Sequence, residues 1–130
     1  MSINRISALV VAVVVLLLPI AGAYAAGEAP SYVELKDAPT IAVDWSKGTT
    51  QAVTLGGNRT LTFSNGQKGG KYTLILRQDA TGSRTISWPS SVHWAGVLGP
   101  MLTTTAGKAD YLGFIFNGVT YDMVWMSQRL

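Results

Sequence analysis

The sequence contains no cysteine and a single histidine, His93, among its 130 residues. Without cysteine the chain forms no disulfide and has no thiol to carry a lipid anchor, which excludes a lipoprotein. Cysteine and histidine are also the usual ligands of zinc, so one histidine alone does not indicate a zinc site. We therefore expect no metal and no cofactor.

Charge is sparse as well, with ten Lys/Arg against seven Asp/Glu and a formal net charge of +3. Removing residues 1–25 would take away one of the ten basic residues, Arg5, and leave nine against seven, a net charge of +2. These charges are scattered, whereas nucleic-acid-binding surfaces need clustered Lys and Arg. We expect no nucleic-acid partner.

A catalytic motif is also missing. His93 lies in the stretch Ser90–Trp94 and has no framing nucleophile motif, since the sequence has no G-x-S-x-G. Paired carboxylates of a glycosidase would have to converge across a groove, and the spacing of the aspartates does not indicate such a pair. The aspartates considered are Asp44, Asp79, Asp110 and Asp122. The sequence predicts a protein that is not an enzyme.

The N-terminal segment has the layout of a cleavable signal peptide. Arg5 precedes an unbroken apolar run at residues 8–18, and the tripeptide Ala23–Ala25 offers small residues at both selective positions. The run is shorter than the roughly 20 residues that span a bilayer. We predict a signal peptide at residues 1–25 and a secreted, cell-surface or periplasmic protein. The alternative is an uncleaved membrane anchor through residues 8–26.

The remaining chain of about 105 residues is predicted to form one small all-β domain. Residues 26–39 read as a linker, an N-terminal arm or a peripheral strand, and residues 40–130 as an antiparallel, jelly-roll-like β-sandwich. Turn signals recur every 8–12 residues, which is the spacing of such folds. The candidate strands are Thr40–Trp45, Gln51–Leu55, Arg59–Ser64, Lys71–Gln78, Arg84–Trp88, Tyr111–Phe116 and Val119–Ser127.

Three connections are predicted to be β-hairpins, because each register places apolar residues opposite one another. The loops are Asn117-Gly118, Asp79–Ser83 and Gly56–Asn58. The pairs they predict are Phe116 with Val119, Leu76 with Ile86, and Val53 with Leu61. Agreement in all three cases favours antiparallel sheets.

Apolar residues also occur on the second faces of these strands, at Ile75, Ile115, Val124 and Met126. Either the strands are central and covered on both sides, or they form a subunit interface, because exposed apolar area tends to associate. We expect a homo-oligomer, formed through these faces or through residues 26–39 added to a neighbour's sheet edge.

Four tryptophans complete the candidates. The predicted registers place Trp88 and Trp125 on core faces. Trp45 and Trp94 are less constrained and could stack on sugar rings, with His93 adjacent to Trp94. These three residues form the tentative binding site, for a surface glycan or an envelope protein.

The segments 70–97 and 102–122 resemble a β-rich module of tailed-bacteriophage tail-fibre and virion structural proteins. The matching residues are Gln78, Asp79, Gly82, Ser83, Arg84, Trp88, Pro89, Trp94, Gly96, Asp110, Phe114 and Gly118. The resemblance implies a virion or tail-fibre role without catalysis. It also implies that Arg84 is structural and pairs with an acidic neighbour such as Asp79.

The sequence thus predicts a secreted, non-enzymatic structural or adhesive β-module that self-associates at a cell, filament or virion surface. One alternative is a carbohydrate-binding module that uses exposed tryptophans. The other is a phage virion protein anchored in a membrane by its N-terminal segment, the one arrangement with a membrane partner.

Overall fold

A computed structural model describes residues 31–96 and 99–129, and these contain nine β-strands and no helix. The predicted signal segment at residues 1–25 lies outside the described residues and stays a prediction. In the described ranges there is no helix of the length and apolar character needed to cross a membrane. The strands are β1 (Tyr32–Glu34), β2 (Thr40–Asp44), β3 (Thr50–Leu55), β4 (Arg59–Ser64), β5 (Lys71–Gln78), β6 (Ile86–Ser87), β7 (Val92–His93), β8 (Ala109–Phe116) and β9 (Tyr121–Arg129).

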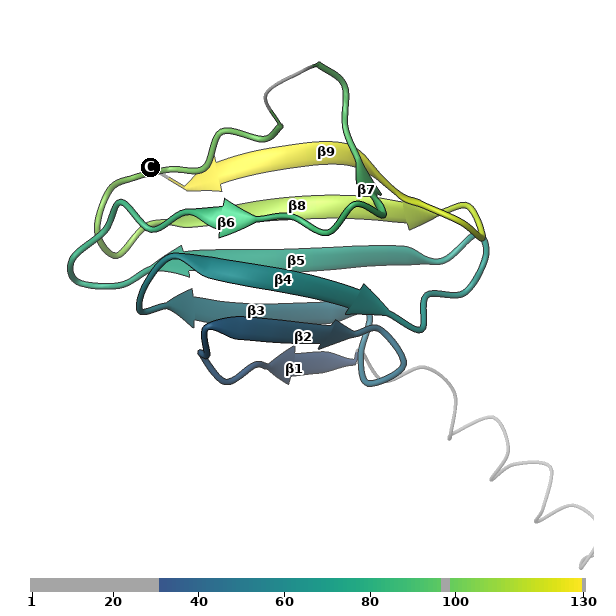
Figure 1. Ribbon diagram of the computed structural model, residues 1–130, viewed down its shortest axis with the longest axis horizontal. Helices are drawn as coiled ribbons and strands as arrows, with labels where there is room; N and C mark the ends of the chain where they lie inside the picture. Colours follow the sequence, from purple (N-terminus) through teal and green to yellow (C-terminus); the bar gives the residue numbers. More distant parts are fainter. Residues whose placement is uncertain (1–30, 97–98, 130) are drawn as a thin grey trace, which may run out of the picture. The chain divides into compact units, whose positions relative to one another are not determined.

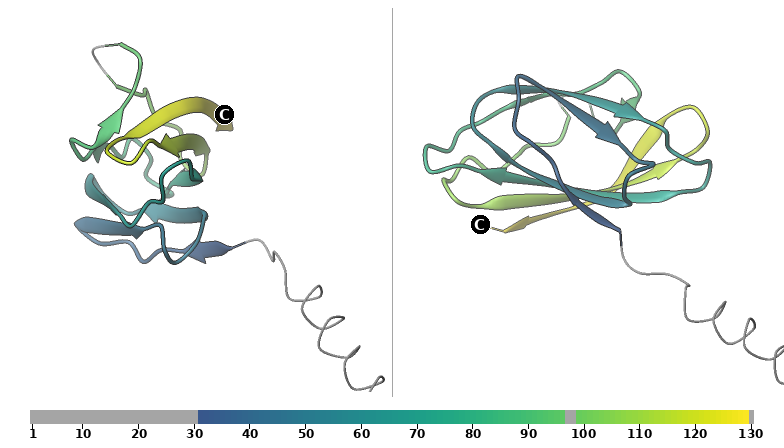
Figure 2. Two further views of the ribbon diagram at one scale, coloured as in Figure 1. Left: turned by 90° about the vertical axis from the view of Figure 1, so that its right-hand side faces the viewer. Right: turned by 90° about the horizontal axis from the view of Figure 1, so that it is seen from below.

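The strands form two stacked sheets (Figure 1). Sheet A has the order β1-β3-β5-β8-β9-β7 and sheet B the order β2-β4-β6. The right-hand view of Figure 2, from below, shows the two layers with the core between them. The predicted all-β sandwich is therefore confirmed.

The first six strands alternate between the two sheets, so the chain winds around the core like a coil. Successive strands of sheet A, β1, β3 and β5, are parallel to one another, and so are β2, β4 and β6 of sheet B. Each full turn of the coil adds one strand to each sheet. The coil therefore has three turns, made by β1–β2, β3–β4 and β5–β6.

The last strands close the sandwich differently. Strands β8 and β9 form an antiparallel hairpin, and β8 also pairs antiparallel with β5 at the last turn of the coil. The short strand β7 pairs parallel with β9 at the far edge of sheet A. Sheet A is thus mixed.

The prediction of antiparallel sheets was wrong for the coil. The loops Gly56–Asn58 and Asp79–Ser83 connect strands of different sheets, so Val53 does not pair with Leu61 and Leu76 does not pair with Ile86. A connection of three extended residues spans roughly 10 Å, which is also the distance between stacked sheets. Loop length alone therefore could not separate a hairpin from a crossing.

The hairpin at Asn117-Gly118 exists, but its register differs by two residues from the prediction. Phe116 pairs with Tyr121 rather than with Val119. The Asn117 amide donates to the Thr120 carbonyl at 3.0 Å, and its side-chain oxygen accepts from the amides of Val119 and Thr120 at 2.8 Å each. These bonds stabilise a four-residue loop. Because the shift is an even number, the same residues of β8 still face the core.

The core lies between the sheets and is mainly apolar. Its buried members are Ile41, Val43, Trp45, Val53, Leu55, Leu61, Tyr72, Leu74, Leu76, Val92, Leu112, Phe114 and Tyr121. Phe63 of sheet B packs edge-on against Trp45, Phe114 and Tyr121, with ring centroids 5.2–5.4 Å apart. Edge-to-face pairs of this kind add to the stabilisation from burial alone.

Residues 31–39 belong to the sandwich as an edge strand and the first crossing. Strand β1 pairs with β3 of the same chain in the register Tyr32–Thr50 to Glu34–Ala52. Residues 32–34 of the predicted 26–39 stretch are thus a peripheral strand of sheet A, whereas residues 26–30 lie outside the described residues.

Two buried glutamines hold the connections of the coil. Gln51 donates through Nε2 to the carbonyls of Asp44 at 2.7 Å and Gly48 at 3.0 Å, within the β2–β3 connection. Gln78 is 3% exposed. Its Nε2 donates to the carbonyls of Arg84 at 3.0 Å and Thr103 at 2.9 Å, and its Oε1 accepts from the Arg84 amide at 2.8 Å. Gln78 thus closes the last crossing of the coil.

Replacing Gln78 by methionine should lower the free energy of unfolding by about 3 kcal/mol. The volume is kept, but two carbonyls and one amide lose their partner in a region that excludes water. Denaturant unfolding followed by tryptophan fluorescence measures the change. Gln67→Met is the matched control, because the Gln67 side chain is exposed, and should change stability by less than about 0.5 kcal/mol. Equal effects of the two variants would contradict this role of Gln78.

Candidate functional site

Trp45, the first predicted binding residue, lies in the core. It is 3% exposed. Its ring stacks on Tyr72 at a centroid distance of 4.8 Å and meets the edge of Phe63 at 5.3 Å. A ring enclosed in this way has no free face for a sugar.

Trp94 and His93 lie at the end of β7. The Trp94 ring packs against the core and meets Trp88 edge-on, with centroids 6.2 Å apart. Gly99 approaches so closely that a Cβ there would lie 2.8 Å from Cζ2 of Trp94. The His93 side chain is exposed. His93 and Trp94 therefore lie next to each other at the end of β7. Trp45, the third residue of the predicted binding site, is buried in the core and does not share an exposed surface with them.

The aspartates considered as catalytic candidates lie in different parts of the sandwich. Asp44 caps the β2–β3 turn by accepting from the amide and hydroxyl of Ser46 at 3.0 and 2.6 Å. Asp110 is buried and accepts from the Thr103 amide at 2.8 Å, and its burial raises its pKa. Asp122 accepts from the hairpin loop. Across the described ranges no group of three or more His, Asp or Glu is arranged to hold a metal ion.

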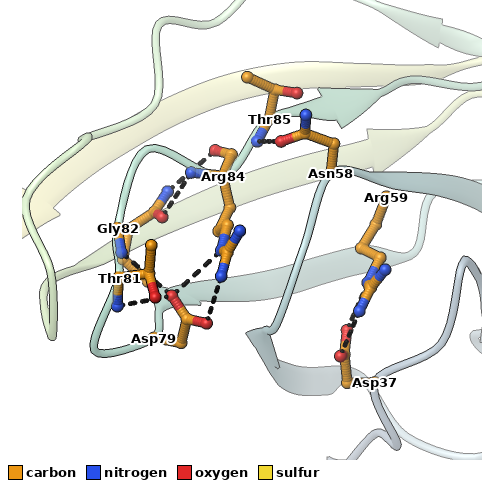
Figure 3. Close-up of polar contacts among 9 residues, drawn as sticks. Asp37, Asn58, Arg59, Asp79, Thr81, Gly82, Arg84 and Thr85 are labelled. Atoms are coloured by element: carbon orange, nitrogen blue, oxygen red, sulfur yellow. Dashed lines mark hydrogen bonds and ion pairs between the residues drawn. The ribbon is translucent and has the colours of Figure 1, made fainter.

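Asp79 organises the crossing between β5 and β6 (Figure 3). Its Oδ1 accepts from the amides of Thr81 and Gly82 at 3.1 and 3.0 Å and from Nε of Arg84 at 3.1 Å. Its Oδ2 accepts from Nη2 of Arg84 at 2.9 Å. Gly82 has φ +74°, and a Cβ there would lie 2.6 Å from the Thr104 carbonyl oxygen, so the turn requires glycine. The predicted structural role of Arg84, paired with Asp79, is confirmed.

A second ion pair lies at the same end of the coil (Figure 3). Arg59 binds Asp37 through two parallel bonds, Nε to Oδ1 at 2.8 Å and Nη2 to Oδ2 at 2.7 Å. The Thr85 amide donates to Oδ1 of Asn58 at 3.0 Å. The first contact links the β1–β2 connection to the start of β4, and the second links the β3–β4 connection to the β5–β6 connection. In the pairs Arg59–Asp37 and Arg84–Asp79, two hydrogen bonds join the guanidinium to the carboxylate, so each charge is neutralised by its partner. We assign both pairs a structural role.

The hydrogen bonds from arginine lower the pKa of both carboxyls. Arg84 is the main cause for Asp79, whose pKa falls to about 2, and Arg59 is the main cause for Asp37. Both groups therefore stay ionised over the whole physiological range.

The outer face of sheet A, turned away from sheet B, carries two exposed aromatic rings, Tyr32 on β1 and Trp125 on β9. Trp125 is 46% exposed, although the predicted register placed it on the core face. The cause is a β-bulge at Gly113/Phe114, where β9 carries an extra residue, Val124. Beyond the bulge Trp125 pairs with Gly113 and faces outward, whereas Met126 pairs with Leu112 and packs on the core.

Gly113 makes room for the Trp125 ring. A Cβ at Gly113 would lie 2.0 Å from Nε1 of Trp125, so the indole occupies the space that any other side chain would need. A lone glycine within an apolar strand is a known sign of a bulge or of close packing. That sign was present in the sequence and could have identified the outward position of Trp125.

Two shallow hollows lie on the outer face of sheet A. The first, of about 270 Å³, is lined by Trp125 together with Lys71, Tyr72, Thr73, Phe114, Ile115 and Val124. The second, of about 320 Å³, is lined by Arg77, Gly107, Lys108, Ala109, Tyr111 and Arg129. The outer face therefore has an aromatic, apolar part and a part with three cations. Of the second-face residues, Ile75 is buried and Val124 is exposed.

Residues 39–121 match the family described as "Putative phage tail fibre C-terminal domain". This range runs from the residue before β2 to the first residue of β9 and covers more than half of the chain. The chain belongs to this family. The predicted resemblance to a tail-fibre module is thereby confirmed. No curated protein and no solved structure matched the chain.

The matched range of the tail fibre domain contains the Gln78–Arg84 crossing and Arg59, but not Asp37, the ion-pair partner of Arg59. The match ends at Tyr121, before Trp125 and Arg129, which lie further along β9 and face outward. The contacts of Gln78 and the Asp79–Arg84 pair are thus within the family's range. Three lining residues of the outer face, Val124, Trp125 and Arg129, are beyond it.

Replacing Asp79 by asparagine should make the tail fibre domain less stable at pH 5–7 than the wild type. The folded-state pKa of about 2 lies below the ordinary value of 3.8, so the carboxylate stabilises the fold above pH 3.8 and this contribution disappears as the pH falls through 2. Melting temperatures measured from pH 6 to pH 2 should therefore converge at the acid end. Arg84→Gln, which removes the other partner, should converge with the wild type in the same range. A difference that stays constant with pH would contradict this assignment.

Proposed function

We propose that this tail fibre domain is a non-enzymatic adhesive module that binds the bacterial surface through the outer face of sheet A. The family places the chain among structural parts of the phage virion. The observation that carries the adhesive role is the half-exposed Trp125 seated over Gly113 beside two hollows. Large aromatic side chains at the centre of a surface patch supply much of the energy of protein recognition.

The distribution of charged groups supports a role without catalysis. In the described part of the chain, three of the arginines are held by carboxylates, in the pairs Arg59–Asp37, Arg77–Glu34 and Arg84–Asp79. The hollows of the outer face are open and are lined by aromatic, apolar and basic side chains. Their lining contains no histidine and no carboxylate, the groups that most often serve in general acid–base catalysis.

The outer face is also suited to contact because it is rigid. Strands β5, β8 and β9 pair over most of their length, and their inner side chains form the core. Side chains on strands of a packed sheet are held in place before a partner arrives, which reduces the entropy lost on binding. An exposed ring on such a support is a better anchor than one on a loop.

Fluorescently labelled protein should be retained by intact cells of at least one strain in a panel of bacteria. Trp125→Ala should weaken the retention about 30-fold, the loss expected of about 2 kcal/mol at an aromatic anchor. Met101→Ala is the matched control, because Met101 is 81% exposed and does not line either hollow. Retention by no strain of the panel, or equal retention of the Trp125 variant and the wild type, would overturn the proposal.

A further inference from the structure

The two hollows lie along one line of the outer face. Trp125 and Arg129 are four residues apart on β9 and both face outward, which separates them by about 13 Å. Tyr111 lies between them on the neighbouring strand, paired with Ser127. The order along the face is therefore an indole, a phenol and then a group of cations.

The cationic hollow has no carboxylate in its lining. Arg77 is held by Glu34, with Nη1 2.6 Å from Oε1, and also donates to the Tyr32 hydroxyl at 2.7 Å. Lys108 and Arg129 have no ion pair with any residue that the structure describes. The hollow thus presents two uncompensated positive charges beside a fixed guanidinium, and its complement is an anion.

The other carboxylate of this face lies at its opposite end. Asp122 pairs in register with Ile115, near the hairpin, and accepts hydrogen bonds from Asn117 at 3.2 Å and Thr120 at 2.8 Å. It is separated from Arg129 by the length of β9. Among the described residues, Asp122 therefore does not neutralise the cationic hollow, and Glu34 is engaged with Arg77.

We propose that the outer face of sheet A binds an acidic polysaccharide, with a sugar ring packed on Trp125 and an acid group in the hollow of Lys108, Tyr111 and Arg129. This inference rests on the adhesive function proposed above and names its ligand class. The apolar C–H face of a sugar fits an indole, while the acid group supplies the charge that the second hollow lacks. The 13 Å between the two parts calls for a chain of sugars rather than a single one.

The observations favour a polysaccharide over a nucleic acid. Beyond this group, the basic residues of the described chain are scattered or paired, and the net charge without residues 1–25 is only +2. A nucleic-acid surface would need cations along an extended track. Here three of the four cations that line the hollows lie together in one hollow, and only Lys71 lines the other, beside the aromatic ring.

The test uses the whole purified protein in affinity electrophoresis through gels that contain polygalacturonate, polysialic acid or dextran. At least one of the two acidic polymers should retard the protein, and neutral dextran should not. Trp125→Ala and the double variant Lys108→Ala/Arg129→Ala should each weaken this binding at least tenfold. Only the double variant should also reduce its dependence on salt, because only it removes charges that contact the ligand.

The double variant Lys47→Ala/Lys68→Ala is the matched control, because it removes the same charge from exposed positions that line neither hollow and should bind like the wild type. Three results would overturn the inference: retardation by neither acidic polymer, equal retardation by dextran, or equal binding of a single-stranded DNA oligonucleotide. A dimer in sedimentation equilibrium that Trp125→Ala dissociates would also overturn it, because a second copy would then occupy the face. If bacteria still retain the protein through Trp125 while both acidic polymers fail, the adhesive function stands and only the ligand class is wrong.

Discussion

The crossing between β5 and β6 is the constraint on which the remaining structure depends. Parallel neighbours cannot be joined by tight hairpins, so each turn of the coil must cross from one sheet to the other and return. Gln78 fixes this crossing through the backbone of Arg84 and Thr103, and Asp79 fixes it through its own turn and the Arg84 side chain. The loop that contains Thr103 leads into β8, so the same glutamine also positions the hairpin that completes sheet A.

Much of the fold could be predicted from the sequence because alternation of apolar residues shows which side chains face the core. The bounds Arg59–Ser64 and Lys71–Gln78 were predicted as the structure has them. Alternation does not show which strand lies beside which, because Leu74 and Leu76 are buried equally well next to β3, β6 or β8. The coil therefore could not be distinguished from a row of hairpins.

The candidate site was harder to predict, since exposure depends on one bulge. Val124 adds a residue to β9, and this reverses the faces of the residues that follow. Trp125 consequently lies outside and Met126 inside, the reverse of the predicted register. Trp45 was misplaced although the sequence could have assigned it: Ile41, Val43 and Trp45 alternate along the predicted strand Thr40–Trp45, and all three are buried. The exposed face of Trp125 thus results from a local irregularity in a regular sheet.

The coil is tested most directly by backbone nuclear Overhauser effects in the isotopically labelled protein. The coil predicts cross-strand contacts between residues 50–55 and 73–78 in parallel register, with Val53 beside Leu76. It also predicts contacts between residues 40–44 and 60–64 in sheet B. Close α-proton contacts between Val53 and Leu61, or between Leu76 and Ile86, are the pattern of antiparallel hairpins and would contradict it.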